Sequence, residues 1–410
     1  MSTPMSNTKR IRVLSLLNAV AMLVFTFYWL HLPYTFGDEA FLIRWSALVK
    51  KSLLGVDPKP APEEVLFVDV SGIKTTIERE NEFGEPSRYH REVITDRGDL
   101  AEFFELVNRF RDELRLVLCD IRFPEATDRD SLLQRQFDRL GDKLLGVSAL
   151  DEEGRLVEPV LELPYALATY QSADDLFLKY PLYFGDSLKT APLVLYERLD
   201  GGRFRSGGWF FHRLDGRLML ADPIIDFRVR NRDFQTGTAL EAAHFTVFNV
   251  GTLLEARAFM APEDLLAFFD DKLVIVGDYQ NDVHETPFGE IAGPLLIYNA
   301  YLTLRERDNR VTLPWILFLL VSYYLLSYRV FAGFEIKKPA RLVSWFQSKA
   351  GRLILHALDE FFLLTLITLL SYFIFHIHIN ILILLIFVKT VEFTWRFFRL
   401  PNERKLVLQE

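Results

Sequence analysis

Residues 65–70, Val65-Leu66-Phe67-Val68-Asp69-Val70, decide the fold class of this chain. Five of the six side chains are apolar, and the single charge, on Asp69, comes one residue before the run ends. A short continuous apolar run of this kind is typical of a buried strand. Two similar runs, at 116–121 and 273–277, predict two further buried strands.

Segments with helical periodicity separate these predicted strands. Residues 99–114 place Phe103, Phe104, Val107, Phe110 and Leu114 on one side of a helix. The same pattern predicts helices at 130–140, 262–269 and 293–305, and apolar runs predict further strands at 144–148 and 245–250. Strands that alternate with helices predict an α/β domain with a parallel sheet.

Two stretches interrupt this rhythm. Residues 155–235 carry several prolines and the Gly201-Gly202 and Gly207-Gly208 pairs between short aromatic runs, which predicts a β-rich insertion packed on the sheet. Residues 78–90 are rich in charge, and we expect them to form a mobile loop.

The distribution of charge and hydropathy points to a membrane protein. The chain has 410 residues, of which 50% are hydrophobic and 14% aromatic, and this composition excludes a disordered chain. Residues 32–312 hold 49 acidic and 33 basic side chains, whereas the two ends together hold 6 acidic and 14 basic. An acidic middle argues against nucleic acid as a partner, because a nucleic-acid binder needs a basic face. We expect one large water-exposed domain between apolar ends.

The N-terminal apolar segment has the features of an uncleaved signal anchor. Lys9, Arg10 and Arg12 precede an uncharged run at 13–30, which is long enough to cross most of a bilayer. The run ends in bulky aromatic residues rather than the small residues of a cleavage site. We therefore predict a transmembrane helix over 13–31.

Three more transmembrane helices are predicted near the C-terminus, over 313–334, 353–375 and 377–396. Lys389 and Glu392 interrupt the last of them, but their i, i+3 spacing allows them to pair on one face of the helix. The alternative for the last two segments is a buried helical hairpin of a soluble domain. His376 and His378, in the turn between them, could form a metal or proton site, but we expect solvated interfacial side chains.

The positive-inside rule orients these four spans in the plasma (inner) membrane. The link over 335–352 and the tail over 397–410 are both basic, so both are predicted to be cytoplasmic. The segment over 1–12 is then cytoplasmic as well, and residues 32–312 form an extracytoplasmic domain. Four spans place every basic segment inside and both termini in the cytoplasm.

Polar side chains follow three predicted strands of the sheet. In open parallel sheets ligands bind beyond the carboxyl ends of the strands. If these strands are neighbours, they form an acidic pocket for a small cationic ligand or a divalent metal. The candidate ligand-binding residues are Asp69, Ser71, Asp120, Arg122, Asp278, Asp282, His284 and Thr286. The alternative is structural: Asp69 and Asp120 cap local turns, and Asp282 and Thr286 brace the loop before Pro287.

Three of these segments also resemble the CHASE2 family of bacterial extracytoplasmic sensory domains. The match is carried by Val68-Asp69-Val70, by Asp120-Ile121-Arg122-Phe123 with Asp130 and Leu133, and by Val274-Ile275-Val276-Gly277 leading to Asp282, Thr286-Pro287, Gly293 and Asn299. The resemblance covers residues 60–310 and the pattern of one span before the domain and three after it. It implies a sensory domain, but family members commonly continue into a cytoplasmic output module, which is not found before Glu410.

Two functions are therefore expected from the sequence. The first is a membrane sensor that binds a ligand or protein outside and signals through its helices to a separate cytoplasmic protein partner; the resemblance to receptors implies a homodimer. The second is a structural subunit whose outer domain docks other proteins of a membrane complex. No P-loop, Gly-x-Ser-x-Gly or His-Glu-x-x-His motif is present, and Cys119 lies within a predicted strand, so neither an enzyme nor a cofactor is predicted.

Overall fold

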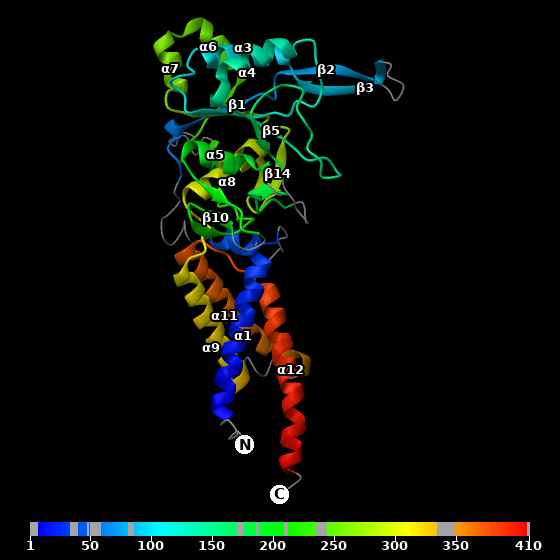
Figure 1. Ribbon diagram of the computed structural model, residues 1–410, viewed down its shortest axis with the longest axis vertical. Helices are drawn as coiled ribbons and strands as arrows, with labels where there is room; N and C mark the ends of the chain where they lie inside the picture. The colour runs from blue at the N-terminus through cyan, green and yellow to red at the C-terminus, as the bar shows by residue number, and fades with distance from the viewer. Residues whose placement is uncertain are drawn as a thin grey trace. The chain divides into compact units, whose positions relative to one another are not determined.

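The computed structural model describes residues 7–32, 40–46, 49, 59–80, 86–169, 176–185, 188–208, 212–234, 244–333 and 349–407 (Figure 1). The chain divides into two compact units. The sheet unit comprises Leu54–Phe204 and Ile225–Arg307, and the helical unit comprises Met1–Leu53, Arg205–Ile224 and Asp308–Glu410.

A six-stranded sheet forms the centre of the sheet unit, with the order β12-β1-β13-β4-β5-β6 and parallel pairing throughout. Its strands are β1 (Val65–Asp69), β4 (Leu116–Asp120), β5 (Leu144–Ser148), β6 (Tyr165–Leu167), β12 (Val247–Asn249) and β13 (Leu273–Gly277). The predicted parallel α/β sheet is thus confirmed. Every residue of β1, β5 and β13 is buried, which explains why these strands read as continuous apolar runs.

Helices cover both faces of this sheet (Figure 1). One face packs against α3 (Arg97–Asn108), α4 (Asp130–Leu140), α6 (Val250–Phe259) and α7 (Pro262–Phe269), and the other against α5 (Ala191–Leu199) and α8 (Gly293–Arg305). Alternate residues of β1 serve the two faces. Val68 belongs to the core beneath α3, whereas Phe67 packs edge-to-face against Tyr298 of α8.

The other strands and the 3₁₀ turns lie outside the central sheet. The strands are β2 (Lys74–Glu80), β3 (Pro86–Thr95), β7 (Tyr183–Phe184), β8 (Leu188–Lys189), β9 (Phe204–Arg205), β10 (His212–Leu214), β11 (Arg217–Met219), β14 (Val283–Thr286) and β15 (Gly289–Ala292), and the 3₁₀ turns are η1 (Pro62–Glu64), η2 (Gly141–Lys143) and η3 (Asn231–Phe234).

Two predictions about irregular segments need correction. The expected mobile loop at 78–90 is part of an antiparallel hairpin of β2 and β3, since the threonine and isoleucine residues of 74–80 and 86–95 favour strands; residues 81–85 lie outside the described chain. The stretch over 155–235 does contain short strands, but it also contains helix α5, and β6 joins the main sheet. Residues 205–224 of this stretch belong to the helical unit.

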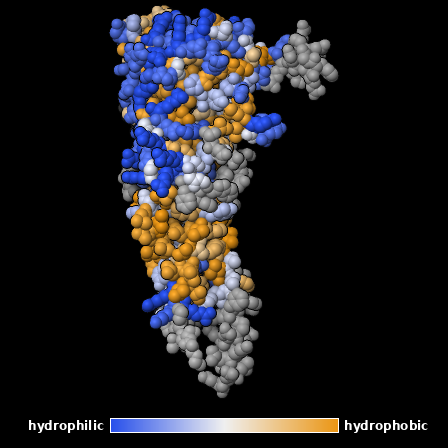
Figure 2. All heavy atoms as spheres, viewed as in Figure 1, coloured by the Kyte–Doolittle hydropathy of each residue, from blue (hydrophilic) through white to orange (hydrophobic). Residues whose placement is uncertain are grey.

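The helical unit contains the helices α1 (Asn7–Leu30), α9 (Leu313–Ala332), α11 (Lys349–Phe375) and α12 (Ile381–Val407). Three segments, Thr8–Leu30, Leu313–Ala332 and Leu358–Phe375, are long and apolar enough to cross a membrane. Figure 2 shows hydrophobic side chains gathered over these helices. The predicted fourth span, 377–396, falls mainly in α12 and is not confirmed. The basic link at 335–352 lies largely outside the described residues.

Apolar and hydroxyl side chains hold the helices of this unit together. Trp315, Leu319 and Tyr323 of α9 are fully buried, and the Tyr323 hydroxyl lies 2.9 Å from Oγ1 of Thr26 on α1. Asn18 of α1 donates a hydrogen bond of 2.8 Å to the Ser327 hydroxyl. The polar side chains within these apolar helices thus find partners in neighbouring helices, as a membrane interior requires.

Charged side chains of three helices also pair with one another. Lys389 of α12 lies 2.8 Å from Glu392, which confirms the predicted i, i+3 pair, and 2.8 Å from Glu360 of α11. Arg329 of α9 lies 3.1 Å from Asp359. The charges that weaken the hydropathy signal of α12 are therefore paired with those of α11.

The two histidines between α11 and α12 differ in environment. His376 is 42% exposed and lies 3.5 Å from an Asp308 oxygen. His378 is buried and stacks on Tyr372, with 4.1 Å between ring centroids. The prediction that both are solvated is therefore wrong for His378, because the adjacent aromatic ring of α11 covers it.

Candidate functional site

A cavity of about 860 Å³ opens at the carboxyl ends of the central strands. The strands β1, β13 and β4 are neighbours, and their register aligns Asp69 with Gly277 and Gly277 with Asp120. The predicted convergence of these strand ends is thus confirmed. The predicted residues Asp120, Arg122, Asp278, Asp282 and His284 line the cavity, whereas Asp69, Ser71 and Thr286 do not.

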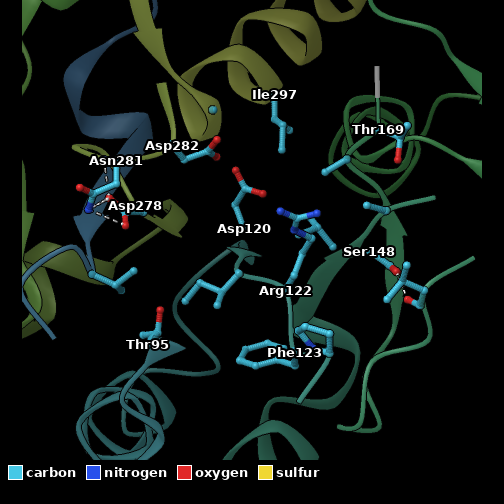
Figure 3. A pocket seen from close by; sticks show the side chains of 18 of the residues that line it. Thr95, Asp120, Arg122, Phe123, Ser148, Thr169, Asp278, Asn281, Asp282 and Ile297 are labelled. Atoms are coloured by element: carbon cyan, nitrogen blue, oxygen red, sulfur yellow. Dashed lines mark hydrogen bonds between the residues drawn. The ribbon is translucent and has the colours of Figure 1, made fainter. Parts of the chain in front are cut away.

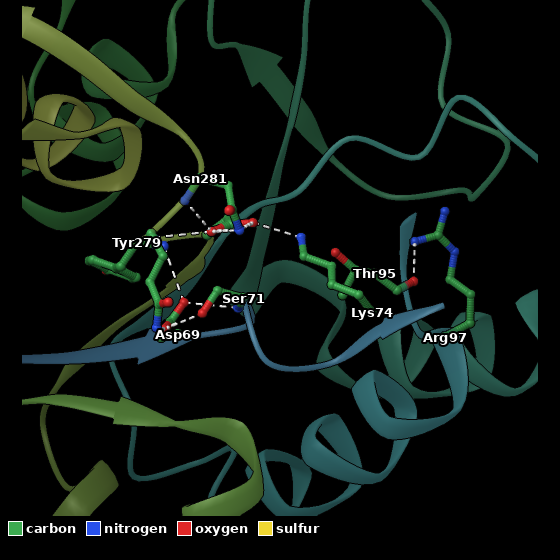
Figure 4. A network of polar contacts seen from close by, with 9 residues as sticks. Asp69, Ser71, Lys74, Thr95, Arg97, Tyr279 and Asn281 are labelled. Carbon is green, nitrogen blue, oxygen red and sulfur yellow. Dashed lines mark hydrogen bonds and ion pairs between the residues drawn. The ribbon is translucent and has the colours of Figure 1, made fainter. Parts of the chain in front are cut away.

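Asp69 fulfils a structural role beside the cavity. The side chain is buried, and Oδ1 accepts hydrogen bonds from the backbone N–H groups of Ser71 and Tyr279, at 2.9 and 3.1 Å. Its Oδ2 accepts from the Ser71 hydroxyl at 2.6 Å and from the Gln280 amide at 3.0 Å (Figure 4). These four bonds tie the turn after β1 to the loop after β13, as the structural alternative predicts for this residue.

Asp278 is engaged by its own loop and by a lysine. The carboxylate accepts from the backbone N–H groups of Gln280 and Asn281, and Lys74 lies 2.7 Å away. Burial by itself raises the pKa of Asp278, but the bonds from Lys74 and Asn281 outweigh it and lower the pKa below its usual value. Asp278 therefore contributes a negative charge to the wall of the cavity, and Lys74 already balances this charge.

Asp120, at the end of β4, has a different environment. The side chain is only partly exposed, and because it lines the cavity this exposure faces the cavity. Within the described part of the chain it forms no hydrogen bond and no ion pair. Burial, reinforced by the negative charge of Asp282 and opposed by Arg122, raises the pKa of Asp120 to about 8. A carboxyl group of this kind remains available to a ligand.

Arg122 follows two residues later and supplies the opposite charge. The residue is exposed and lines the same cavity. Its guanidinium likewise makes no hydrogen bond or ion pair with any residue that the structure describes. Figure 3 shows the side chains of Asp120, Arg122 and Asp282 pointing toward the same part of the cavity.

Asp282 and His284 approach from the loop and strand that follow β13. His284 Nε2 lies 3.0 Å from Oδ1 of Asp282, and the His284 ring packs against Phe177. The Asp282 carbonyl accepts a hydrogen bond of 2.7 Å from the backbone N–H of Gly293, the first residue of α8. These contacts orient the Asp282 carboxylate at the cavity.

Thr286 is buried and braces the β14–β15 hairpin. Its hydroxyl donates to the Gly289 carbonyl at 2.6 Å and accepts from the Phe288 N–H at 3.1 Å. The structural alternative is therefore confirmed for Thr286, whereas Asp282 reaches the cavity.

Several lining residues were not singled out in the sequence. Phe123 forms part of one wall and carries the guanidinium of the buried Arg97 over its ring, at 4.4 Å from the centroid. Further lining residues include Lys74, Ser148, Thr169, Phe177, Asn281 and Ile297. Asn281 could have been found, since it lies between Asp278 and Asp282; the others come from elements whose approach only the fold decides.

The divalent-metal hypothesis finds no support in the cavity. No group of three or more histidine, cysteine, aspartate or glutamate side chains within the described ranges has the geometry of a metal site. Asp69 and Asp278 use their oxygens for internal hydrogen bonds, which leaves too few carboxylate ligands for a hard cation.

Comparisons with known proteins returned no relatives. No protein-family model matches the chain, and neither a curated protein nor a solved structure matches it.

Proposed function

We propose that this protein is a membrane-anchored sensor whose sheet unit binds a small ligand outside the cytoplasm and transmits binding to its helices. The observation that carries the proposal is the cavity of about 860 Å³ at the strand ends. Asp120 and Arg122 lie in its wall, and neither forms an ion pair with another part of the chain that the structure describes. Ligand sites in proteins have volumes of roughly 300–1,000 Å³ and a few convergent polar groups. The resemblance to CHASE2 sensory domains supports the same function.

The electrostatics of Asp120 favour a binding role over a structural one. Asp120 is only partly exposed and its charged form is disfavoured there, so the residue costs free energy of folding, and a chain under no functional constraint gains stability by replacing it. Asp69 provides the contrast in the same unit, because all its bonds serve the fold. Polar groups that remain unsatisfied in a cavity are typical of sites that a ligand completes.

We further propose that α12 is a fourth membrane span, so that both termini are cytoplasmic. Lys389 is the charge nearest the middle of its apolar segment, and it is neutralised by Glu360 and Glu392 at 2.8 Å each. Paired charges that face neighbouring helices are the form in which ionisable residues are tolerated in membranes. The basic residues over 396–405 then lie on the cytoplasmic side.

The chain provides separate reporters for its two units. Cys119 is the sole cysteine of the sequence and is fully buried in β4 of the sheet unit. All six tryptophans of the sequence fall within the ranges of the helical unit. A fluorogenic maleimide that reacts with Cys119 on heating therefore reports unfolding of the sheet unit, and tryptophan fluorescence reports the environment of the helices.

The test uses the full-length protein in detergent with a panel of amino acids, sugars, nucleosides, polyamines, organic acids and divalent cations. A sensor is expected to show saturable stabilisation of Cys119 against labelling, by about 5–10 °C at a hundredfold excess over Kd, and a ligand-dependent change in tryptophan fluorescence. Stabilisation without a fluorescence change would restrict the protein to binding. If no compound of the panel stabilises the protein and a protein partner co-purifies with it at fixed stoichiometry, the result would favour the docking subunit.

A cysteine scan decides the number of spans. We expect a membrane-impermeant maleimide to label Glu152→Cys in spheroplasts, but to label Lys9→Cys and Arg404→Cys only after permeabilisation. Labelling of Arg404→Cys in intact spheroplasts would mean an odd number of spans and would exclude the fourth. The buried Cys119 gives little background labelling in the unaltered control.

A further inference from the structure

The charged side chains around the cavity divide into paired and unpaired groups. Lys74 pairs with Asp278 at 2.7 Å, and His284 contacts Asp282 at 3.0 Å. Asp120 and Arg122 have no hydrogen-bonding or ionic partner among the residues that the structure describes. Glu92, which also lines the cavity, has a partner of its own, so the carboxyl group of Asp120 and the guanidinium of Arg122 are the pair that this inference concerns.

The two free groups lie close together for a simple geometric reason. Asp120 ends β4 and Arg122 follows two residues later, and both side chains point toward the same part of the cavity (Figure 3). Asp282 approaches Asp120 from the opposite direction, from the loop after β13 (Figure 3). One part of the cavity thus has two carboxyl groups on one side and a guanidinium on the other.

We propose, on the basis of the ligand-binding function above, that the cavity takes a dipolar molecule of the α-amino acid class with an apolar side chain. The ammonium group lies between Asp120 and Asp282. The carboxylate lies on Arg122, whose planar fork matches a carboxylate in a bidentate pair.

Ligands that carry a single charge fit this arrangement less well. A simple amine would satisfy Asp120 and Asp282 but would leave the Arg122 guanidinium beside a second cation. A simple carboxylate would pair with Arg122 but would face the negative charge of Asp282. Only a molecule with both charges, separated by a few bonds, complements both sides.

The cavity walls around Asp120, Asp282 and Arg122 are largely apolar, which favours a ligand with an apolar side chain. Phe123, Phe177, Leu296 and Ile297 line the cavity together with several other apolar residues. With a volume of about 860 Å³, the cavity has room for a bulky side chain beyond the charged groups. Apolar lining with few oriented polar groups is the common composition of small-molecule sites.

The experiment uses three probes that share one apolar body. L-Phenylalanine carries both charges, phenethylamine lacks the carboxylate, and 3-phenylpropanoate lacks the ammonium. Each is titrated against the full-length protein in detergent, with the Cys119 labelling temperature as the readout. We expect phenylalanine to stabilise Cys119 saturably, with an affinity roughly ten- to hundredfold above that of either analogue, since a charged hydrogen-bond pair contributes about that factor.

Two variants assign the charges to individual groups. Arg122→Gln is expected to reduce the affinity for phenylalanine to about that for phenethylamine. The affinity for phenethylamine should rise slightly in this variant, because the guanidinium no longer lies beside the bound ammonium. Asp120→Asn is expected to lower the affinity of the protein for both phenylalanine and phenethylamine, because both carry the ammonium group. Arg139→Gln and Glu152→Gln, which change exposed side chains that do not line the cavity, serve as matched controls.

The proposal is overturned if phenethylamine binds the unaltered protein as tightly as phenylalanine, or if phenylalanine at about 10 mM gives no stabilisation. It is also overturned if Arg122→Gln lowers the affinities for phenylalanine and phenethylamine equally, because the guanidinium then makes no specific contact with the carboxylate of phenylalanine. These failures differ from failure of the ligand-binding function. If another compound of the panel stabilises Cys119, the sensor proposal stands and only the ligand class is wrong.

Discussion

Gly293, the first residue of α8, leaves space for the carboxylate of Asp282, which lies where a Cβ on residue 293 would stand. The backbone N–H of Gly293 also donates to the Asp282 carbonyl at 2.7 Å. The position of the Asp282 carboxylate at the cavity therefore depends on the missing side chain of its neighbour.

Gly293→Ala is expected to alter the cavity with little effect on stability. The added methyl group overlaps Asp282 Oδ2, but a carboxylate is a movable group, and alanine favours the helix by up to about 1 kcal/mol over glycine. We expect the labelling temperature of Cys119 to change by a few degrees at most, while stabilisation by phenylalanine falls. Unchanged binding in this variant would show that the ligand does not contact Asp282.

Gly277→Ala is expected to show the opposite pattern. A Cβ at residue 277 would overlap the ring of Pro294, which cannot rotate away, and would press on Cβ of Asp120. Overpacking of this kind costs about 1–3 kcal/mol, so Cys119 should become labelled at a clearly lower temperature. Gly251→Ala serves as the control, because Gly251, like Gly277, lacks a positive φ and the nearest atom to an added Cβ is only the side-chain oxygen of Asn249, at 3.2 Å.

Asp69→Asn tests the structural role of the buried carboxylate. The amide nitrogen of asparagine cannot accept the bonds that Asp69 Oδ2 receives from Ser71 and Gln280. We expect the free energy of unfolding, from urea titration followed by Cys119 labelling, to fall by about 1–3 kcal/mol. Asp128→Asn changes an exposed carboxylate and should leave that free energy unaltered. The same result for both variants would contradict the assigned network.

Asp120 should make the stability of the sheet unit depend on pH. Its pKa is raised from 3.8 to about 8, so the folded state holds a proton that the unfolded state loses above about pH 4. The contribution of Asp120 is fully present below pH 4 and is lost as the pH rises toward 8, at no more than about 1.4 kcal/mol per pH unit.

Comparison with Asp120→Asn isolates this effect. The variant has no group to titrate at residue 120, so its free energy of unfolding should rise relative to the unaltered protein between about pH 4 and 8 and then run parallel to it. The measurement is a urea titration at each pH, followed by a brief maleimide pulse at a common pH. If the free energies of unfolding of the two proteins change in parallel from about pH 4 to 8, the pKa of Asp120 is not raised.

Lys389→Met should destabilise the helical unit. The substitution leaves Glu360, whose side chain is 7% exposed, without its 2.8 Å partner, and breaking a buried pair costs about 3–5 kcal/mol. We expect tryptophan fluorescence to report a lower unfolding temperature in detergent. The double variant Lys389→Met/Glu360→Gln should recover part of the loss, and Arg12→Gln, at an exposed position, should show none.

The sequence alone determined the parallel α/β character of the sheet unit, five of its six central strands, and the apolar character of the three candidate membrane helices. The buried strands β1 and β13 consist almost entirely of apolar residues, because both of their faces are covered, and the sequence therefore shows them as continuous apolar runs. The same runs predicted that the strand ends carrying Asp69 and Asp120 meet at one edge of the sheet, and the register confirms it.

Only the tertiary structure decided which of the strand-end carboxylates serve the fold and which are open to a ligand. Asp69 and Asp120 occupy equivalent positions in their strands, yet Asp69 accepts four hydrogen bonds and Asp120 accepts none from the residues that the structure describes. The difference arises from the loop after β13, whose N–H and amide groups turn toward Asp69, while Asp282 of the same loop brings a like charge to Asp120. Hydrogen-bond partners depend on where distant backbone groups come to lie, and that information is not local in the sequence.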